Sequence, residues 1–130
     1  MIVTPFYAGL LAVFFFILSA RVVAVRRRVS LGDGGDPIVL RRMRGHANFA
    51  EYVPLILLMM AFLEYNRVPA WQLHAMGATL VVARLLHGTA LSFTRKWFFG
   101  RFFGTVLTFT LLNVCGLYCI AQGLRAMGAF

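Results

Sequence analysis

Four apolar stretches, each about 20 residues long, run through this chain and leave little sequence outside them. A helix of that length crosses a hydrocarbon core of roughly 30 Å. We expect an all-α integral membrane fold with one domain over residues 1–130. The composition agrees, since 61% of the residues are hydrophobic and 13% are charged. The expected membrane-spanning helices lie near residues 4–25, 39–64, 70–92 and 101–125.

Positive charge sets the expected orientation of these helices. Nine of the 13 basic residues flank the first and third connections, among them Arg28 and Arg95. Cytoplasmic loops carry the excess of Lys and Arg, so we expect both connections in the cytoplasm and both termini on the other side. The charges follow the first apolar stretch, which indicates a retained helix and not a signal peptide. They also punctuate apolar spans without forming one basic face, so we expect no nucleic-acid partner.

Polar side chains interrupt the second and third stretches at a shared depth. Arg44, Asn48 and Glu51 have the spacing of one helical face, and Glu51 lies roughly 10 Å deeper than Arg44. Arg84 lies at a similar depth on the next antiparallel helix, which makes Glu51 and Arg84 candidates for an ion pair. The other half of the spans is almost wholly apolar. A charge at membrane depth costs roughly 2.5–3.5 kcal/mol, so it usually has a partner and marks a functional site.

These side chains predict the chemistry of a ligand. Arg21, His87 and Arg101 add polar groups from the other helices at the cytoplasmic half. Guanidinium groups bind carboxylates in pairs of bonds, and a carboxylate accepts bonds from ammonium groups. We therefore expect a small, multiply charged zwitterion from the cytoplasm and an apolar second ligand from the bilayer. A structural alternative stays open, because arginines reach lipid phosphates and Asn48 and Glu51 can serve helix packing.

Two other polar features are assigned structural roles. Cys115 and Cys119 lie one helical turn apart in an apolar span, which is typical of buried packing residues. The first connection carries Asp33 and Asp36 in a glycine-rich turn, which indicates solvation. No cluster has the spacing of a metal site, so we expect no metal.

The second stretch also carries a family resemblance. The run Arg44-x-His46-x-Asn48-x-x-Glu51-Tyr52-x-Pro54 resembles the second-helix signature of the MAPEG family, the membrane-associated proteins in eicosanoid and glutathione metabolism. Ser19-Ala20-Arg21 resembles the end of the family's first helix, and Ala83-Arg84-Leu85 with His87 resembles its third. The turn over residues 32–35 is most similar to a small bacterial inner-membrane branch.

The resemblance implies a left-handed four-helix bundle that assembles as a homotrimer, with glutathione between subunits near the cytoplasmic side. It implies Arg101 as the catalytic residue that activates the glutathione thiol. It assigns glutathione binding to polar residues of the first three helices, namely Arg21, Arg44, His46, Asn48, Glu51, Tyr52, Arg84 and His87. Two third-helix tyrosines of some members are His87 and Leu91 here, which weakens the case for eicosanoid activities.

We expect a glutathione transferase or peroxidase that acts on lipophilic electrophiles. The thiolate is the nucleophile and a free thiol has a pKa near 8.5, so Arg101 would favour the reactive form. One alternative is a non-catalytic membrane scaffold that binds lipid or glutathione, as one family member binds lipid without catalysis. Another is a small multidrug exporter, which also has four helices and an intramembrane acid. Exporters carry that acid in the first helix, where this chain has Arg21 and no acid.

Overall fold

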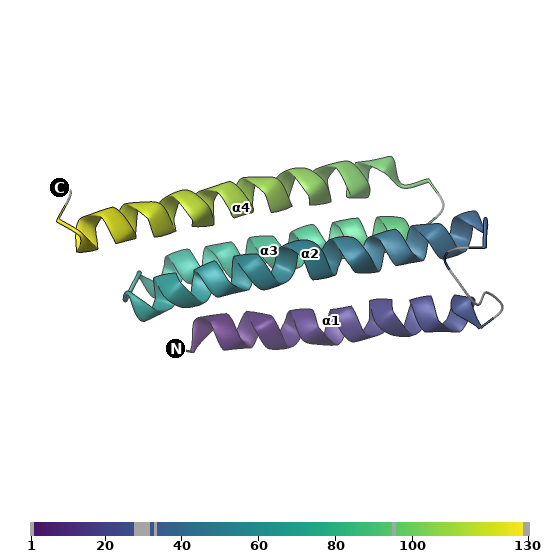
Figure 1. Ribbon diagram of the computed structural model, residues 1–130, viewed down its shortest axis with the longest axis horizontal. Coiled ribbons are helices and arrows are strands. Elements are labelled where there is room, and N and C mark those ends of the chain that lie inside the picture. The colour runs from purple at the N-terminus through teal and green to yellow at the C-terminus, as the bar shows by residue number, and fades with distance from the viewer. Residues whose placement is uncertain (1, 28–31, 33, 95, 129–130) are drawn as a thin grey trace.

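The computed structural model describes residues 2–27, 32, 34–94 and 96–128 and consists mainly of four long helices (Figure 1). They are α1 (Val3–Arg26), α2 (Pro37–Tyr65), α3 (Ala70–Ser92) and α4 (Phe98–Ala126). All four are long and apolar enough to cross a membrane, and no strand occurs in the described ranges. The predicted four-helix membrane fold is thus confirmed, with bounds that differ by three residues at most. The hand of the bundle and the trimer stay predictions.

Local sequence signals explain where α2 begins and ends. Asp36 accepts a hydrogen bond from the Ile38 N–H at 2.7 Å, and a proline occupies the first turn. At the other end Arg67 adopts a left-handed φ of 59°. The Arg67 N–H donates to the Glu64 carbonyl and the next N–H donates to the Leu63 carbonyl, which closes the helix. The resulting short turn makes α2 and α3 an antiparallel hairpin, as predicted. Asp33, Arg28 and Arg95 lie outside the described residues.

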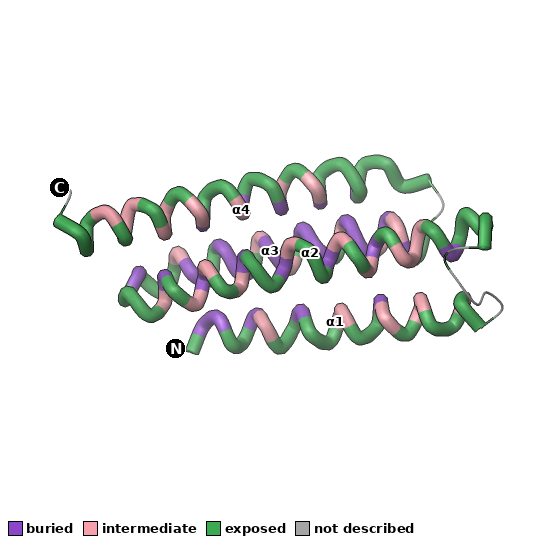
Figure 2. Tube along the Cα trace, viewed as in Figure 1, coloured by how far each residue is buried: buried purple, intermediate pink, exposed green. Residues whose placement is uncertain are grey.

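The α2–α3 pair lies between α1 and α4, which do not pack against each other in the described chain (Figure 1). Buried positions concentrate on α2 and α3, whereas the outer faces of α1 and α4 are mostly exposed (Figure 2). Those outer faces carry large apolar side chains such as Phe16 and Leu117, which suit contact with lipid tails.

Glycines allow the closest approaches between helices. A Cβ on Gly77 would lie 2.2 Å from the ring of Tyr7 on α1. A Cβ on Gly104 would lie 2.7 Å from the His87 backbone nitrogen, so α4 touches the backbone of α3 there. Gly104 belongs to the buried stripe Gly100, Gly104 and Thr108, a spacing typical of packed membrane helices. This contact sets the start of α4 beside His87.

Glu64 caps the first turn of α1. Its carboxylate accepts hydrogen bonds from the N–H groups of Val3 and Thr4, both at 2.8 Å, and from that of Ile2. The first N–H groups of a helix have no partner inside the helix and carry partial positive charge, which explains the pairing.

Glu64 lies in the half of the helices opposite the predicted cytoplasmic half. The prediction that this opposite half is almost wholly apolar is wrong. Besides Glu64, the Tyr7 hydroxyl lies 3.1 Å from His74 Nδ1, and Tyr118 donates to Gln72 Oε1 at 2.9 Å. Each pair joins two helices, and its two polar groups satisfy each other's hydrogen-bonding needs. Because the partners lie on different helices, the sequence gives only a weak signal of these bonds.

We predict that Glu64→Ala lowers the free energy of unfolding by about 1–2 kcal/mol, because α1 loses its N-terminal cap. Thermal unfolding in detergent measures this effect. Glu51→Gln is the matched control, since Glu51 lies on the same helix, is exposed and has no partner among the described residues. An equal melting temperature for Glu64→Ala and Glu51→Gln would contradict the capping role.

Candidate functional site

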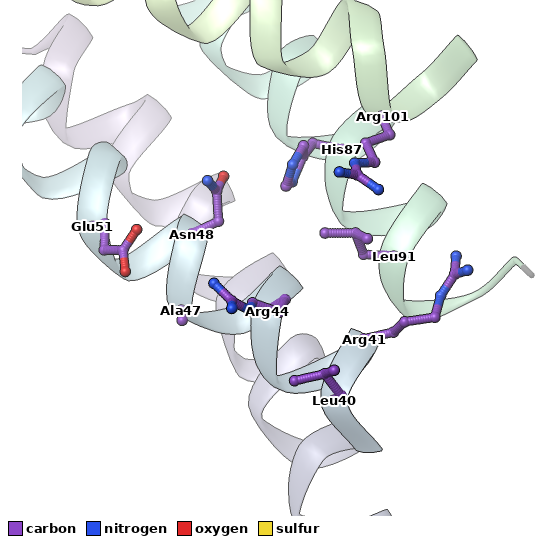
Figure 3. A pocket seen from close by; sticks show the side chains of 9 residues that line it. All are labelled: Leu40, Arg41, Arg44, Ala47, Asn48, Glu51, His87, Leu91 and Arg101. Atoms are coloured by element: carbon purple, nitrogen blue, oxygen red, sulfur yellow. The ribbon is translucent and has the colours of Figure 1, made fainter. Parts of the chain in front are cut away.

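A hollow of about 430 Å³ opens between α2 and α4, with α3 at its base (Figure 3). Figure 3 shows Arg44, Asn48 and Glu51 along α2, with His87 and Arg101 on the other side. We call this space the polar hollow. Its lining consists of Leu40, Arg41, Arg44, Ala47, Asn48, Glu51, His87, Leu91 and Arg101.

Five residues predicted for the site come together in the polar hollow. Arg44 and Glu51 are exposed on α2, and Asn48 between them is half-buried, so the predicted helical face is present. His87 is buried in α3, and Arg101 is exposed in the first turn of α4. Within the described ranges, the side chains of Arg44, Glu51 and Arg101 make no hydrogen bond or ion pair.

Arg84 is almost fully buried, with 2% of its surface exposed, and lies behind the polar hollow. Its Nη1 donates to Asn48 Oδ1 on α2 at 2.8 Å, and its Nη2 donates to the Gly104 carbonyl on α4 at 3.4 Å. Nη2 also donates to the Thr108 hydroxyl. One guanidinium group from α3 therefore joins α2 and α4, and it holds Asn48 in place.

The predicted ion pair between Glu51 and Arg84 is absent from the described chain. The two residues lie at a similar depth, but depth does not fix the direction of a side chain. Arg84 points into the bundle, where neutral oxygens accept its bonds, whereas Glu51 lies at the exposed side of the polar hollow. Arg84 therefore has a structural role in the bundle, whereas the Glu51 carboxylate is accessible.

Arg21 lies outside the polar hollow and caps the end of α3. Its Nη2 donates to the Ser92 carbonyl at 2.6 Å, its Nε donates to the Ser92 hydroxyl at 3.1 Å, and its guanidinium lies 3.8 Å from the Phe93 ring centroid. Arg41 serves the same helix end, with Nη2 donating at 2.9 Å to the carbonyls of Ala90 and Thr94. Cations at a helix C-terminus are favourable because the terminal carbonyls carry partial negative charge.

His46 and Tyr52 also do not line the polar hollow within one chain. His46 Nε2 lies 3.1 Å from the Ser19 hydroxyl, and its ring stacks on Phe15 of α1 at 4.6 Å. Tyr52 packs against Phe109 of α4, with ring centroids 5.5 Å apart. Their role in glutathione binding stays a prediction, as it does for Arg21 and Arg84.

Four lining residues were missing from the predicted set: Leu40, Arg41, Ala47 and Leu91. The first three lie on the same face of α2 as Arg44 and Glu51, so helical spacing was sufficient to predict them as lining residues. Leu91 lies one helical turn beyond His87 on α3, and both line the polar hollow.

The charge of the lining is unbalanced. Three arginines and one glutamate line it, so the polar hollow favours a ligand with more negative than positive groups. The described residues contain no group of three or more His, Cys, Asp or Glu that could hold a metal ion. Cys115 and Cys119 pack against Met76 and Met59 and do not line the hollow, so a reactive thiol there would come from the ligand.

Comparison with known proteins identifies the family. A family model described as "MAPEG family" matches residues 4–121. The chain belongs to the MAPEG family. It is therefore a membrane protein of the family named for eicosanoid and glutathione metabolism, and this match disfavours the exporter alternative.

Two bacterial relatives support the assignment. The chain is 37% identical over 87 residues to "Inner membrane protein YecN" of Escherichia coli strain K12, and equally to the protein of that name from E. coli O6:H1 strain CFT073. The match covers 65% of this chain and 66% of each relative, slightly less than two thirds of the relatives' length. No solved structure shows a significant match to the chain.

We predict that Arg84→Lys lowers the free energy of unfolding by about 2–3 kcal/mol, because a single ammonium cannot bond to α2 and α4 as a guanidinium does. Thermal unfolding in detergent measures the loss. Arg101→Lys is the control, since Arg101 is exposed and joins no helices. Equal melting temperatures for the two variants would show that Arg84 does not hold the bundle together.

Proposed function

We propose that the polar hollow binds glutathione and that the protein is a glutathione transferase or peroxidase acting on lipophilic electrophiles. The observation that carries this proposal is a hollow lined by three arginines and one glutamate, in a member of the MAPEG family. Its volume of about 430 Å³ is in the range of small-molecule sites.

The charges of glutathione complement this lining. Glutathione has two carboxylates, one ammonium group and one thiol. Arg44 and Arg101 are exposed in the polar hollow and can each bind a carboxylate or thiolate. Glu51 can accept bonds from the ammonium group, and Asn48, held by Arg84, can pair with a peptide group. The peptide would then be fixed in one pose, which is the orienting part of catalysis.

Arg101 is the proposed thiol-activating residue. A guanidinium group beside a thiol lowers the thiol pKa, because it stabilises the thiolate. The thiol proton would leave to solvent, the sulfur would form a bond to the electrophilic carbon, and the leaving group would depart with its electron pair. The buried His87 imidazole lines the same space and can contact the ligand.

We also propose a homotrimer with sites between subunits. Glu51 and Arg44 are exposed on a helix that is expected to span a membrane, and charges facing lipid tails are costly. A neighbouring subunit would cover them and close the polar hollow around its ligand. The lipophilic substrate would then reach the thiolate from the bilayer along the apolar outer face of α4.

The proposed location is a bacterial inner membrane, as in the printed name of the relatives. Lys96 and the other described basic residues near the first and third connections support an orientation with those connections in the cytoplasm and both termini in the periplasm.

We predict that glutathione binds the purified protein and that Arg44→Ala and Glu51→Gln each weaken binding roughly tenfold, because each removes a charged hydrogen-bonding partner. Isothermal titration calorimetry measures the affinities. Arg125→Ala is the matched control, since Arg125 lies in the last turn of α4, away from the polar hollow. Binding that is unchanged in Arg44→Ala and Glu51→Gln would place glutathione elsewhere.

We predict that Arg101→Ala retains part of the glutathione affinity but loses the ultraviolet absorbance of bound thiolate at neutral pH, together with most conjugation activity. Stopped-flow absorbance and turnover with a lipophilic electrophile measure the two effects. Full thiolate signal and full turnover in this variant would remove Arg101 from the catalytic role. Glutathione binding by the natural protein without turnover of any electrophile would favour the non-catalytic scaffold.

A further inference from the structure

A second hollow, of about 300 Å³, lies where α3 ends and α4 begins, and we propose that it binds the phosphate of an anionic membrane lipid. We call it the cationic hollow. Its lining consists of Arg41, Ala90, Lys96, Trp97, Phe98 and Arg101. The proposal goes beyond the proposed function, because a lipid headgroup is neither glutathione nor the electrophile.

Charge is the first argument for this ligand. Three cationic side chains line the cationic hollow, and no carboxylate does. The hydrogen bonds from Arg41 to the carbonyls of Ala90 and Thr94, both at 2.9 Å, fix this guanidinium at the end of α3. Lys96 and Arg101 are exposed, and their side-chain cations have no hydrogen-bonding partner or carboxylate partner within the described residues. An anion would balance this charge, and arginine and lysine are the side chains that commonly bind phosphate.

Position along the membrane normal is the second argument. α3 ends at Ser92 and α4 begins at Phe98, so the cationic hollow lies at the end of two membrane-spanning helices. That level of a membrane protein meets the lipid headgroups. Basic pockets between helices on the cytoplasmic side are typical binding places for anionic headgroups. The first turn of α4 adds partial positive charge and carries no acidic residue.

Aromatic side chains favour a lipid over a soluble phosphate. Trp97 is 40% exposed and Phe98 is 73% exposed, although both line a cationic site. Such rings occur at the boundary between headgroups and acyl chains. They would lie along the glycerol and upper acyl region while the cations bind the phosphate. A free phosphate ion would leave these apolar surfaces without a partner.

The two hollows share Arg41 and Arg101. A lipid phosphate in the cationic hollow would therefore lower the positive potential in the polar hollow. Glutathione affinity should then be lower in membranes rich in anionic lipid. This consequence rests on the proposed function, whereas the lipid-binding test below contains no glutathione and stands apart from it.

Native mass spectrometry of the purified protein with added phosphatidylglycerol, phosphatidylcholine or inorganic phosphate tests the proposal. We predict that phosphatidylglycerol is retained more strongly than phosphatidylcholine. Lys96→Gln should weaken its retention roughly fivefold, and Lys96→Glu about 25-fold, because one or two units of charge are lost. Lys96→Arg should retain the lipid, since the charge is kept.

Arg125→Gln is the matched control, because it removes one cation of α4 far from the cationic hollow and should leave phosphatidylglycerol binding unchanged. Melting temperatures without lipid establish that each variant is folded, and the exposed position of Lys96 makes folding of its variants expected. Equal retention of the two lipids, or full phosphatidylglycerol binding by Lys96→Glu, would overturn the proposal. Displacement of phosphatidylglycerol by equimolar inorganic phosphate would show that the site takes a soluble anion.

Discussion

The buried guanidinium group of Arg84 holds together the part of the bundle that carries the polar hollow. Removing such a group from water is costly, and here neutral oxygens of Asn48, Gly104 and Thr108 accept hydrogen bonds from both terminal nitrogens, whereas Nε has no partner among the described residues. These bonds require α4 to lie against α3, which it does because Gly104 has no side chain to prevent the contact. This one group therefore orients Asn48 and sets the distance from α2 to the first turn of α4, where Arg101 lies.

Charged residues in this protein divide into two kinds. Arg21, Arg41 and Glu64 cap helix ends, and their partners are backbone groups of neighbouring helices. The charged groups of Arg44, Glu51 and Arg101 instead face open space, with no hydrogen-bonding or ion-pair partner in the described chain. In a membrane, charges of the second kind need a ligand or a neighbouring subunit. This division, more than the number of arginines, is what marks the candidate functional site.

Apolar length and helical spacing were enough to predict the four helices and the shared face of Arg44, Asn48 and Glu51. They could not predict the direction of Arg84, because two residues at equal depth can point to different sides of a bundle. Glu64 was missed for a related reason: its partners are backbone N–H groups 60 or more residues away, which leave no trace in side-chain patterns. The family motif predicted His46 among the glutathione-binding residues. It could not distinguish residues such as His46, which contacts α1, from those that line the polar hollow.

The central claim is that the unpaired charged side chains of the polar hollow bind one small anionic peptide. An experimental structure of the protein with glutathione in a lipid environment tests it most directly. We predict density for the peptide in the polar hollow, with a carboxylate at Arg44, its sulfur at Arg101 and its ammonium group at Glu51. An empty polar hollow at saturating glutathione, or Glu51 in contact with acyl chains, would contradict the account.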